Sequence, residues 1–419
     1  MDSRLGPPFV YKLYLRNQWV YCNMVKTPVY MDNHATTRVD DRVIDAMVPL
    51  LGETYGNPGS VNHVFGWDAQ EVVKQSRLSI AEHLGASSNE IIFTSGATES
   101  NNLAIRGVME RKRRRGNHVI SVQTEHHAVL DPLDRLKRAG CEITLLEVAK
   151  QGTSDAGRIN LEKLADAIRE DTALVTIMLA NNEIGVIQDV ASIGSICKDA
   201  GVLFHCDATQ AVGRLPINAK ELNVSLLSLS AHKFYGPKGV GVLYIRNENP
   251  RVRVEPIFTG GGQERGVRSG TLNPAGIAGM AKAMTLAVEE MQQENLRLSQ
   301  LRNRLYAGLI NEIPDVVLNG PELDNRELRL ANNLNLSFSN VDGEALMMSM
   351  RDLAISSGSA CSSTNPEPSH VLRALGLSDD MTRASLRFGL GRFNTEAEVD
   401  FAIELVKRSV GRLRALKSI

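Results

Sequence analysis

A lysine in this chain follows a short apolar run at a position where its side chain can do chemistry. Lys233 lies in SLSAHKFYGPKGVGVLYI, in a turn rich in glycine and polar residues. A lysine whose pKa is lowered can form a Schiff base with a carbonyl group. The alternative is an ordinary exposed loop lysine, the commonest situation for this residue type.

An aspartate occupies a comparable position. Asp207 ends the apolar run of VLFHCDATQAVG, at the carboxyl end of a predicted strand, where open α/β sheets bind their ligands. Its carboxylate suits either the pyridinium nitrogen of a cofactor or the N-cap of a following helix. The sequence leaves both interpretations open.

The segment FTSGATESNN has the composition of a phosphate-binding turn. Gly96, Ala97 and Thr98 stand between an apolar strand and a helical pattern, and we expect Thr98 to cap that helix. The free N–H groups and the dipole of a helix N-terminus can hold a phosphate. The segment has neither a Walker lysine nor a GxGxxG pattern, so a plain strand-to-helix turn is the alternative.

A histidine and a cysteine complete the set of candidates. His126, in TEHHAVLDP, suits a stacking or acid–base role, with an ordinary hydrogen-bonded histidine as the alternative. Adjacent histidines do not easily share one tetrahedral metal, so no metal site is expected. Cys361 lies in SSGSACSSTNPEPSHVL, a run that predicts an exposed, mobile loop. It is the one cysteine predicted to be an accessible nucleophile, with an idle loop thiol as the alternative.

The elements that must position these residues follow from hydrophobic periodicity. Strands are predicted at 118–122, 142–147, 173–179, 202–206, 226–229 and 240–245, and helices at 127–139, 161–170 and 190–200. This alternation predicts a mainly parallel sheet covered by helices on both faces. A long helical stretch from 275 to about 311 then leads to an α+β region with a helix at 343–352 and a final helix from about Thr395.

Composition excludes several classes of protein. Lys and Arg number 47 against 48 Asp and Glu, so the formal net charge is −1 and a bulk nucleic-acid binder is not expected. The basic run RKRRR at 111–115 is interpreted as a solvated helix end, with a partner contact as the alternative. Five cysteines in 419 residues are too few for a disulfide framework, which indicates a reducing compartment. The sequence contains no apolar run long enough to predict a membrane-spanning helix.

Residues 1–23 differ from the rest of the chain. They hold five aromatic residues, whereas the other 396 positions hold 15, and they lack the apolar region and cleavage site of a signal peptide. Met24 begins a segment that looks like an ordinary start. We therefore interpret residues 1–23 as a dispensable extension.

Ten motifs, in order, resemble the cysteine desulfurases, which are fold-type-I pyridoxal-phosphate enzymes of the class V aminotransferase superfamily. They are YMDNHATT, YGNPGSVNH, TSGATESNN, EHHAVLD, NNEIGVIQD, HCDATQAVG, SAHKFYGPKGVG, GGGQERGVRSGT, SSGSACSS and RFGLGRFNT. The long cysteine loop is similar to that of the group serving general iron–sulfur assembly and nitrogen fixation. The resemblance implies a mainly parallel seven-stranded sheet flanked by helices, plus a smaller α+β domain. The implied cofactor-binding domain spans 41–290, and the small domain spans 24–40 and 291–419, with the cysteine loop at about 355–370.

The resemblance also implies roles for particular residues. Lys233 would hold pyridoxal 5′-phosphate covalently, Asp207 would pair with its pyridinium nitrogen, and His126 would stack on its ring and act as acid–base. Arg387 would clamp the substrate carboxylate, for which a planar guanidinium is suited. Cys361 would accept the sulfur, and a transient iron–sulfur cluster contact there is left open. Further cofactor contacts would come from Ala97, Thr98, Asn182 (which would also contact substrate), Gln210, Ser230, His232 and, from the other subunit of a homodimer, Thr271.

The implied reaction converts L-cysteine to L-alanine, with sulfur passed from Cys361 to an iron–sulfur scaffold, a tRNA-thiolation protein or another acceptor. A cytoplasmic enzyme without a membrane or direct nucleic-acid partner is expected. Within the class, the alternative is a selenocysteine lyase or another enzyme without a persulfide step. From other classes, a nucleotide-binding oxidoreductase lacks its GxGxxG fingerprint, and a cofactor-free scaffold predicts a colourless protein.

Deletion of residues 1–23 is expected to leave cofactor binding and turnover unchanged, because the motifs begin only near Val29. The visible absorbance per subunit and the kcat/KM of the truncated and full-length chains, measured side by side, check this. A clear loss of either quantity would contradict the interpretation.

Overall fold

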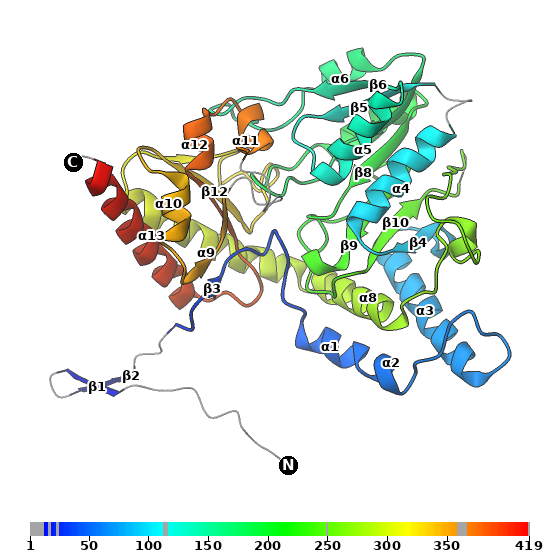
Figure 1. The fold of residues 1–419 in the computed structure, drawn as a ribbon, viewed down its shortest axis with the longest axis horizontal. Helices are drawn as coiled ribbons and strands as arrows, with labels where there is room; N and C mark the ends of the chain where they lie inside the picture. The colour runs from blue at the N-terminus through cyan, green and yellow to red at the C-terminus, as the bar shows by residue number, and fades with distance from the viewer. Residues whose placement is uncertain are drawn as a thin grey trace.

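The computed structural model describes residues 12–15, 18–21, 25–111, 116–248, 250–357 and 367–417. Its largest element is a seven-stranded sheet in the order β4-β10-β9-β8-β7-β5-β6 (Figure 1). The strands are β4 (Ile91–Thr94), β5 (His118–Val122), β6 (Glu142–Leu146), β7 (Thr172–Thr176), β8 (Leu203–Asp207), β9 (Leu226–Ser230) and β10 (Gly241–Ile245). The predicted mainly parallel sheet is confirmed. Only β10 runs antiparallel to its neighbours, because the short link from β9 leaves no room for a helical crossover.

Helices cover both faces of this sheet (Figure 1). On one face, α4 (Ala97–Glu110) and α5 (His127–Arg138) join a cluster that includes Leu226 and Leu243. On the other face, a cluster includes Leu227 and Val242. It is covered by α3 (Val64–His83), α6 (Leu161–Ala167), α7 (Val190–Asp199) and α8 (Pro274–Glu289). Successive strand residues point to opposite faces, and both faces are buried for every strand except β6, so most residues of these strands are apolar.

The second layer is an antiparallel sheet in the order β11-β12-β15-β14. Its strands are β11 (Val316–Leu318), β12 (Asn333–Phe338), β14 (Ser356–Ser357) and β15 (Ser385–Gly389), and the long helices are α9 (Met291–Glu312) and α13 (Glu396–Lys417). A short parallel pair, β3 (Val29–Tyr30) with β13 (Leu353–Ala354), brings the start of the chain into this layer. The remaining elements are β1 (Lys12–Leu15), β2 (Gln18–Tyr21), α1 (Asp41–Met47), α2 (Pro49–Gly52), α10 (Gly343–Met348), α11 (His370–Ala374) and α12 (Asp379–Arg383).

The predicted division into domains stays a prediction, because α11 packs across the proposed boundary. Its residues Val371 and Leu372 belong to the apolar cluster of the large sheet, together with Leu330. None of the described helices is long and apolar enough to cross a membrane.

Several predicted helix ends are wrong. The stretch 275–311 is two helices, α8 and α9, which meet at Glu290. There the Glu290 carboxylate binds Arg42 and Arg392, tertiary contacts that periodicity does not reveal. The helices predicted at 161–170 and 343–352 end early, at Ala167 and Met348. The basic run follows the end of α4 at Glu110, and most of it lies outside the described residues.

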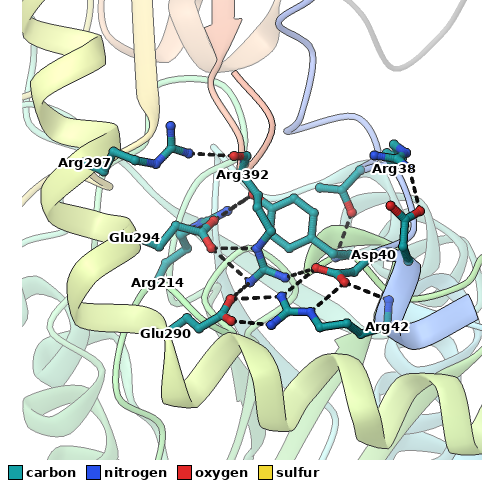
Figure 2. Close-up of polar contacts among 11 residues, drawn as sticks. Arg38, Asp40, Arg42, Arg214, Glu290, Glu294, Arg297 and Arg392 are labelled. Atoms are coloured by element: carbon teal, nitrogen blue, oxygen red, sulfur yellow. Dashed lines mark hydrogen bonds and ion pairs between the residues drawn. The ribbon is translucent and has the colours of Figure 1, made fainter. Parts of the chain in front are cut away.

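A buried carboxylate joins the two layers (Figure 2). Glu294 on α9 accepts hydrogen bonds from Arg214 and from the Tyr235 hydroxyl, each at 2.8 Å, and its other oxygen binds Arg392 at 2.9 Å. Arg392, which follows β15, also binds Asp40 at the start of α1 at 2.6 Å. Burial raises the pKa of Glu294, but Arg214 and Arg392 more than offset it and hold that pKa below its usual value. One ion-pair cluster therefore connects four segments that are distant in sequence.

Replacing Glu294 with Ala is expected to lower the free energy of unfolding by about 3–5 kcal/mol, because the buried guanidinium group of Arg214 loses its carboxylate partner and Arg392 loses one of its three. Urea unfolding followed by circular dichroism measures this change. The matched control is Glu71→Ala, which removes an exposed carboxylate paired with Lys74 on α3 and should leave the midpoint unchanged. Equal midpoints for the two variants would show that the cluster does not hold the layers together.

Candidate active site

A cavity of about 570 Å³ opens at the edge of the large sheet where its parallel strands end. It lies between the turns that follow β4, β5, β7, β8 and β9 on one side and β15 with the segment before α1 on the other. The predicted site residues that line it are Ala97, Thr98, His126, Asn182, Asp207, Gln210, Ser230, His232, Lys233 and Arg387. Two predicted residues are not among them. Thr271 is exposed and outside the cavity lining, and Cys361 lies outside the described residues.

Lys233 points into the cavity because backbone carbonyl groups hold its ammonium group. It ends a short 3₁₀ turn that follows β9 directly. Its Nζ donates to the carbonyl oxygens of His34, at 2.6 Å, and Ala35, at 2.8 Å. The N–H of Tyr235 donates to Thr37 Oγ1 at 2.8 Å, which ties the lysine turn to the same N-terminal segment. The alternative of an exposed loop lysine is therefore wrong.

Asp207 is buried at the floor of the cavity, at the end of β8. Its Oδ2 accepts from Asn101 Nδ2 at 2.6 Å, and its Oδ1 accepts from the N–H of Thr209 at 2.9 Å. The residues that follow form turns and no helix begins at Asp207, so the N-cap alternative is wrong. The donors on both oxygens fix the orientation of this carboxylate at the cavity.

The N-terminus of α4 opens toward the cavity. The N-cap is Gly96, with φ 146° and no side-chain cap, so the prediction that Thr98 caps this helix is wrong. The first N–H groups of a helix have no acceptor inside it, and here no side chain covers them. A Cβ at Gly96 would lie 3.5 Å from Ser230 Oγ, so the glycine keeps the space between Ser230 and the helix end open. This arrangement suits a phosphate group.

Two histidines in the cavity are held neutral by their surroundings. His126 precedes α5, and its Nδ1 accepts from the N–H of Ala128 at 3.0 Å. Burial lowers the pKa of His126. His232 Nδ1 lies 3.1 Å from Thr36 Oγ1, and burial, with Lys233 beside it, lowers its pKa to about 4. A neutral His126 carries its proton on Nε2, since Nδ1 is an acceptor.

Arg387 on β15 is almost fully buried and faces the cavity. Its Nη2 binds Asp32 Oδ1 at 2.8 Å, and its Nη1 donates to the Asn182 carbonyl at 3.2 Å. Its Nε is buried and has no partner among the described residues. A buried guanidinium with an unpaired donor is suited to binding a carboxylate.

Sequence reasoning missed two buried acids next to the site. Glu125 Oε1 accepts from the N–H of Met178 at 2.6 Å, and burial, reinforced by Asp207, raises the pKa of Glu125 well above its usual value. Glu183 accepts from Ser369 Oγ at 2.5 Å, and burial raises its pKa to about 7. Both acids stand inside motifs that mark the site, EHHAVLD and NNEIGVIQD, but the motifs do not indicate that their carboxyl groups are buried.

The chain matches known proteins along most of its length. The family model for class-V aminotransferases matches residues 29–401. "Cysteine desulfurase IscS" of Histophilus somni (strain 2336) is 52% identical over 397 residues, which cover 94% of this chain and 96% of that protein. Among solved structures, a "NifS-like protein" has a TM-score of 0.83 and 38% identity, covering 92% of this chain and 100% of that one. "SspA in complex with cysteine" has a TM-score of 0.75 and 34% identity, covering 87% and 99%.

The chain belongs to the class-V aminotransferase family, and its resemblance to cysteine desulfurases is confirmed. Pyridoxal phosphate is the cofactor of this enzyme. The cavity fits that molecule, because it combines an amine on Lys233, a buried carboxylate on Asp207 and the uncapped helix N-terminus at Gly96. When bound, the cofactor acts as an electron sink for the amino-acid substrate.

Replacing Asp207 with Ala is expected to raise the dissociation constant of pyridoxal phosphate about 10- to 100-fold, because one charge-assisted hydrogen bond is lost. Spectrophotometric titration of the dialysed protein with the cofactor measures it. Asp199→Ala, an exposed carboxylate at the end of α7, is the matched control and should bind as the parent does. Equal cofactor affinities for both variants would show that Asp207 does not contact the cofactor.

Proposed function

We propose that this enzyme converts L-cysteine to L-alanine and carries the sulfur as a persulfide on Cys361. The observation that carries the proposal is one cavity that holds Lys233, Asp207 and Arg387 together. Lysine and aspartate suit the cofactor, and the buried guanidinium suits the carboxylate of an amino acid. The names of the relatives, and a similar structure described as a complex with cysteine, support cysteine as that amino acid.

The described residues divide the work of binding and proton transfer. Arg387 binds the substrate carboxylate and so orients the Cα–H bond, with Asn182 beside it supplying a carbonyl that fixes the guanidinium plane. Lys233 Nζ, once it leaves the carbonyl groups of His34 and Ala35, is placed to take the Cα proton. His126, neutral because of burial, covers the cavity and supplies an N–H at Nε2. The Asp207 carboxylate would pair with the pyridinium nitrogen of the cofactor.

The atoms and electrons of the sulfur transfer balance when a single thiol accepts the sulfur. The Cys361 thiolate bonds to the substrate sulfur, the carbon–sulfur bond of the substrate breaks, and its electron pair stays on carbon, which then takes a proton. L-Cysteine and a thiol thus become L-alanine and a persulfide, with no external oxidant. The described cysteines do not suit this role, because Cys141, Cys197 and Cys206 are buried. Burial raises the pKa of Cys197 to about 12 and that of Cys206 well above its usual value.

The proposal extends to a homodimer that passes sulfur to a scaffold or other acceptor protein in the cytoplasm. Apolar side chains between α2 and the first turns of α3 are exposed, namely Leu51, Tyr55, Val61 and Trp67. Exposed apolar side chains that gather in one region are typical of a protein–protein contact. In this homodimer, the second copy would supply the Thr271 side chain that one chain does not bring to its own cavity. We also propose that residues 41–290 form the cofactor-binding domain and that residues 24–40 and 291–419 form the small domain.

Replacing Cys361 with Ala is expected to leave the yellow colour intact and to abolish persulfide formation. Borohydride reduction of the variant should still attach the cofactor to Lys233, because the cavity residues are unchanged. Peptide mass spectrometry locates both the reduced adduct and the persulfide after incubation with L-cysteine.

Cys197→Ala is the matched control, since its thiol is buried on α7 and should not carry sulfur. Full desulfurase turnover by Cys361→Ala would contradict the transfer role and leave an enzyme without a persulfide step. A colourless parent protein without a Lys233 adduct would contradict the enzyme itself.

A further inference from the structure

The side chain of His34 connects the cavity to the second layer of the molecule. It lies on the segment between β3 and α1, is buried, and lines the cavity. Its Nδ1 is 3.2 Å from Gln210 Oε1, and its Nε2 is 3.2 Å from Asn333 Nδ2 on β12. The backbone at His34 packs against Gly389, where a Cβ would come within 2.8 Å of the His34 nitrogen. The imidazole is therefore fixed between two neutral amides.

The direction of these hydrogen bonds is set by a group that can only donate. Arg329 Nη2 donates to Asn333 Oδ1 at 3.0 Å, so this oxygen of Asn333 is the acceptor. The Asn333 nitrogen must then be the donor to its other two partners. These are the carbonyl oxygen of Glu183, at 3.0 Å, and His34 Nε2. The second partner of that nitrogen is therefore an unprotonated ring atom.

The tautomer of His34 follows from this polarity. Burial, followed by the charge of Arg387, lowers the pKa of His34 to about 3, so the ring is neutral. A neutral ring with an acceptor at Nε2 carries its proton at Nδ1. His34 Nδ1–H therefore donates to Gln210 Oε1.

Gln210 is oriented by the same residue at both ends of its amide. Its oxygen faces the imidazole, and its Nε2 donates to the His34 carbonyl at 3.0 Å. That carbonyl also accepts from Lys233 Nζ. An amide nitrogen has two N–H groups, and the second one of Gln210 has no acceptor among the described residues. It is left for a ligand in the cavity that Gln210 lines.

We propose that His34 is a positioning residue that sets the polarity of the Gln210 amide, so that Gln210 presents an N–H donor and not a carbonyl to the ring oxygen of the cofactor. The proposal rests on the proposed contact between Gln210 and the cofactor. A series of hydrogen bonds leads from the second layer to the cavity, and each residue donates to the next, in the order Arg329, Asn333, His34 and Gln210. A flipped amide would place a lone pair against a negatively charged ring oxygen.

The pKa of the visible chromophore of the holoenzyme reports on this contact. A donor to the ring oxygen stabilises its anionic form and lowers that pKa. Gln210→Ala is expected to raise it by about one pH unit, the size of one hydrogen bond to a charged group. His34→Ala is expected to raise it by part of that amount, because the backbone carbonyl of residue 34 still accepts from Gln210 Nε2. The double variant is expected to show no further rise, because His34 acts through Gln210. Absorbance spectra recorded across the pH range, together with cofactor dissociation constants, measure these shifts.

Two further variants separate positioning from general damage. His34→Asn offers an amide N–H to Gln210 and is expected to restore the parent pKa. His83→Ala removes a partly buried imidazole that contacts Thr285 and is not part of the cavity lining, and it should change nothing. An additive rise in the double variant, or no rescue by His34→Asn, would overturn the proposal. An unshifted Gln210→Ala would instead show that Gln210 does not contact the cofactor.

A measurement on the parent protein covers the case in which His34→Ala does not fold. The ¹⁵N chemical shifts of histidine rings distinguish a protonated from a bare nitrogen, and His34→Asn assigns the His34 signals by their disappearance. The proposal requires a protonated Nδ1 and a bare Nε2 at neutral pH. The opposite tautomer, or a doubly protonated ring, would overturn it.

Discussion

The arrangement of the site depends on the segment 29–40, which crosses between the two layers and is bound by both. Its carbonyl groups at His34 and Ala35 hold the Lys233 ammonium, and Asp40 binds Arg392 beyond β15. Glu294 completes this junction with Arg214, Arg392 and Tyr235. Lys233 is contributed by the large sheet and Arg387 by the small one, so the distance between amine and guanidinium depends on these contacts. A loosened junction would separate the cofactor from the group that binds its substrate.

Burial shifts the pKa values of several titratable groups in and around the cavity in the direction that favours their uncharged forms. His34, His126 and His232 have lowered pKa values, and Glu125 and Glu183 have raised ones, and in each case burial is the largest cause. In a low dielectric, an unpaired charge is costly, whereas a neutral ring or acid can still form hydrogen bonds. The charges that remain are paired or aimed at ligands. The site can therefore present donors and acceptors of defined direction.

Much of the fold was predictable because most strands of the large sheet are short runs of sequence that are buried on both faces. The ends of β5 agree with the predicted strand, and Asp207 and Lys233 follow strands as expected. Helix ends were harder to predict. The break lies at Glu290, whose carboxylate binds Arg42 and Arg392, and the uncapped start at Gly96 leaves helix donors for a ligand. Both features serve contacts outside their own helix, which propensity does not include.

The sequence by itself determined the class of the protein and the chemistry of its site. Lysine, aspartate and arginine at these positions have side chains whose chemistry is independent of the fold, and the ten motifs place them in order. Only the tertiary structure decided how the groups are oriented. Three of these orientations come from contacts between distant segments. Asp32 binds Arg387, two backbone carbonyls hold Lys233, and Arg329 sets the direction of the Gln210 amide through the residues between them. The direction of a hydrogen bond depends on which partner lies next to each group in space. The burial of a group depends on how the whole chain packs.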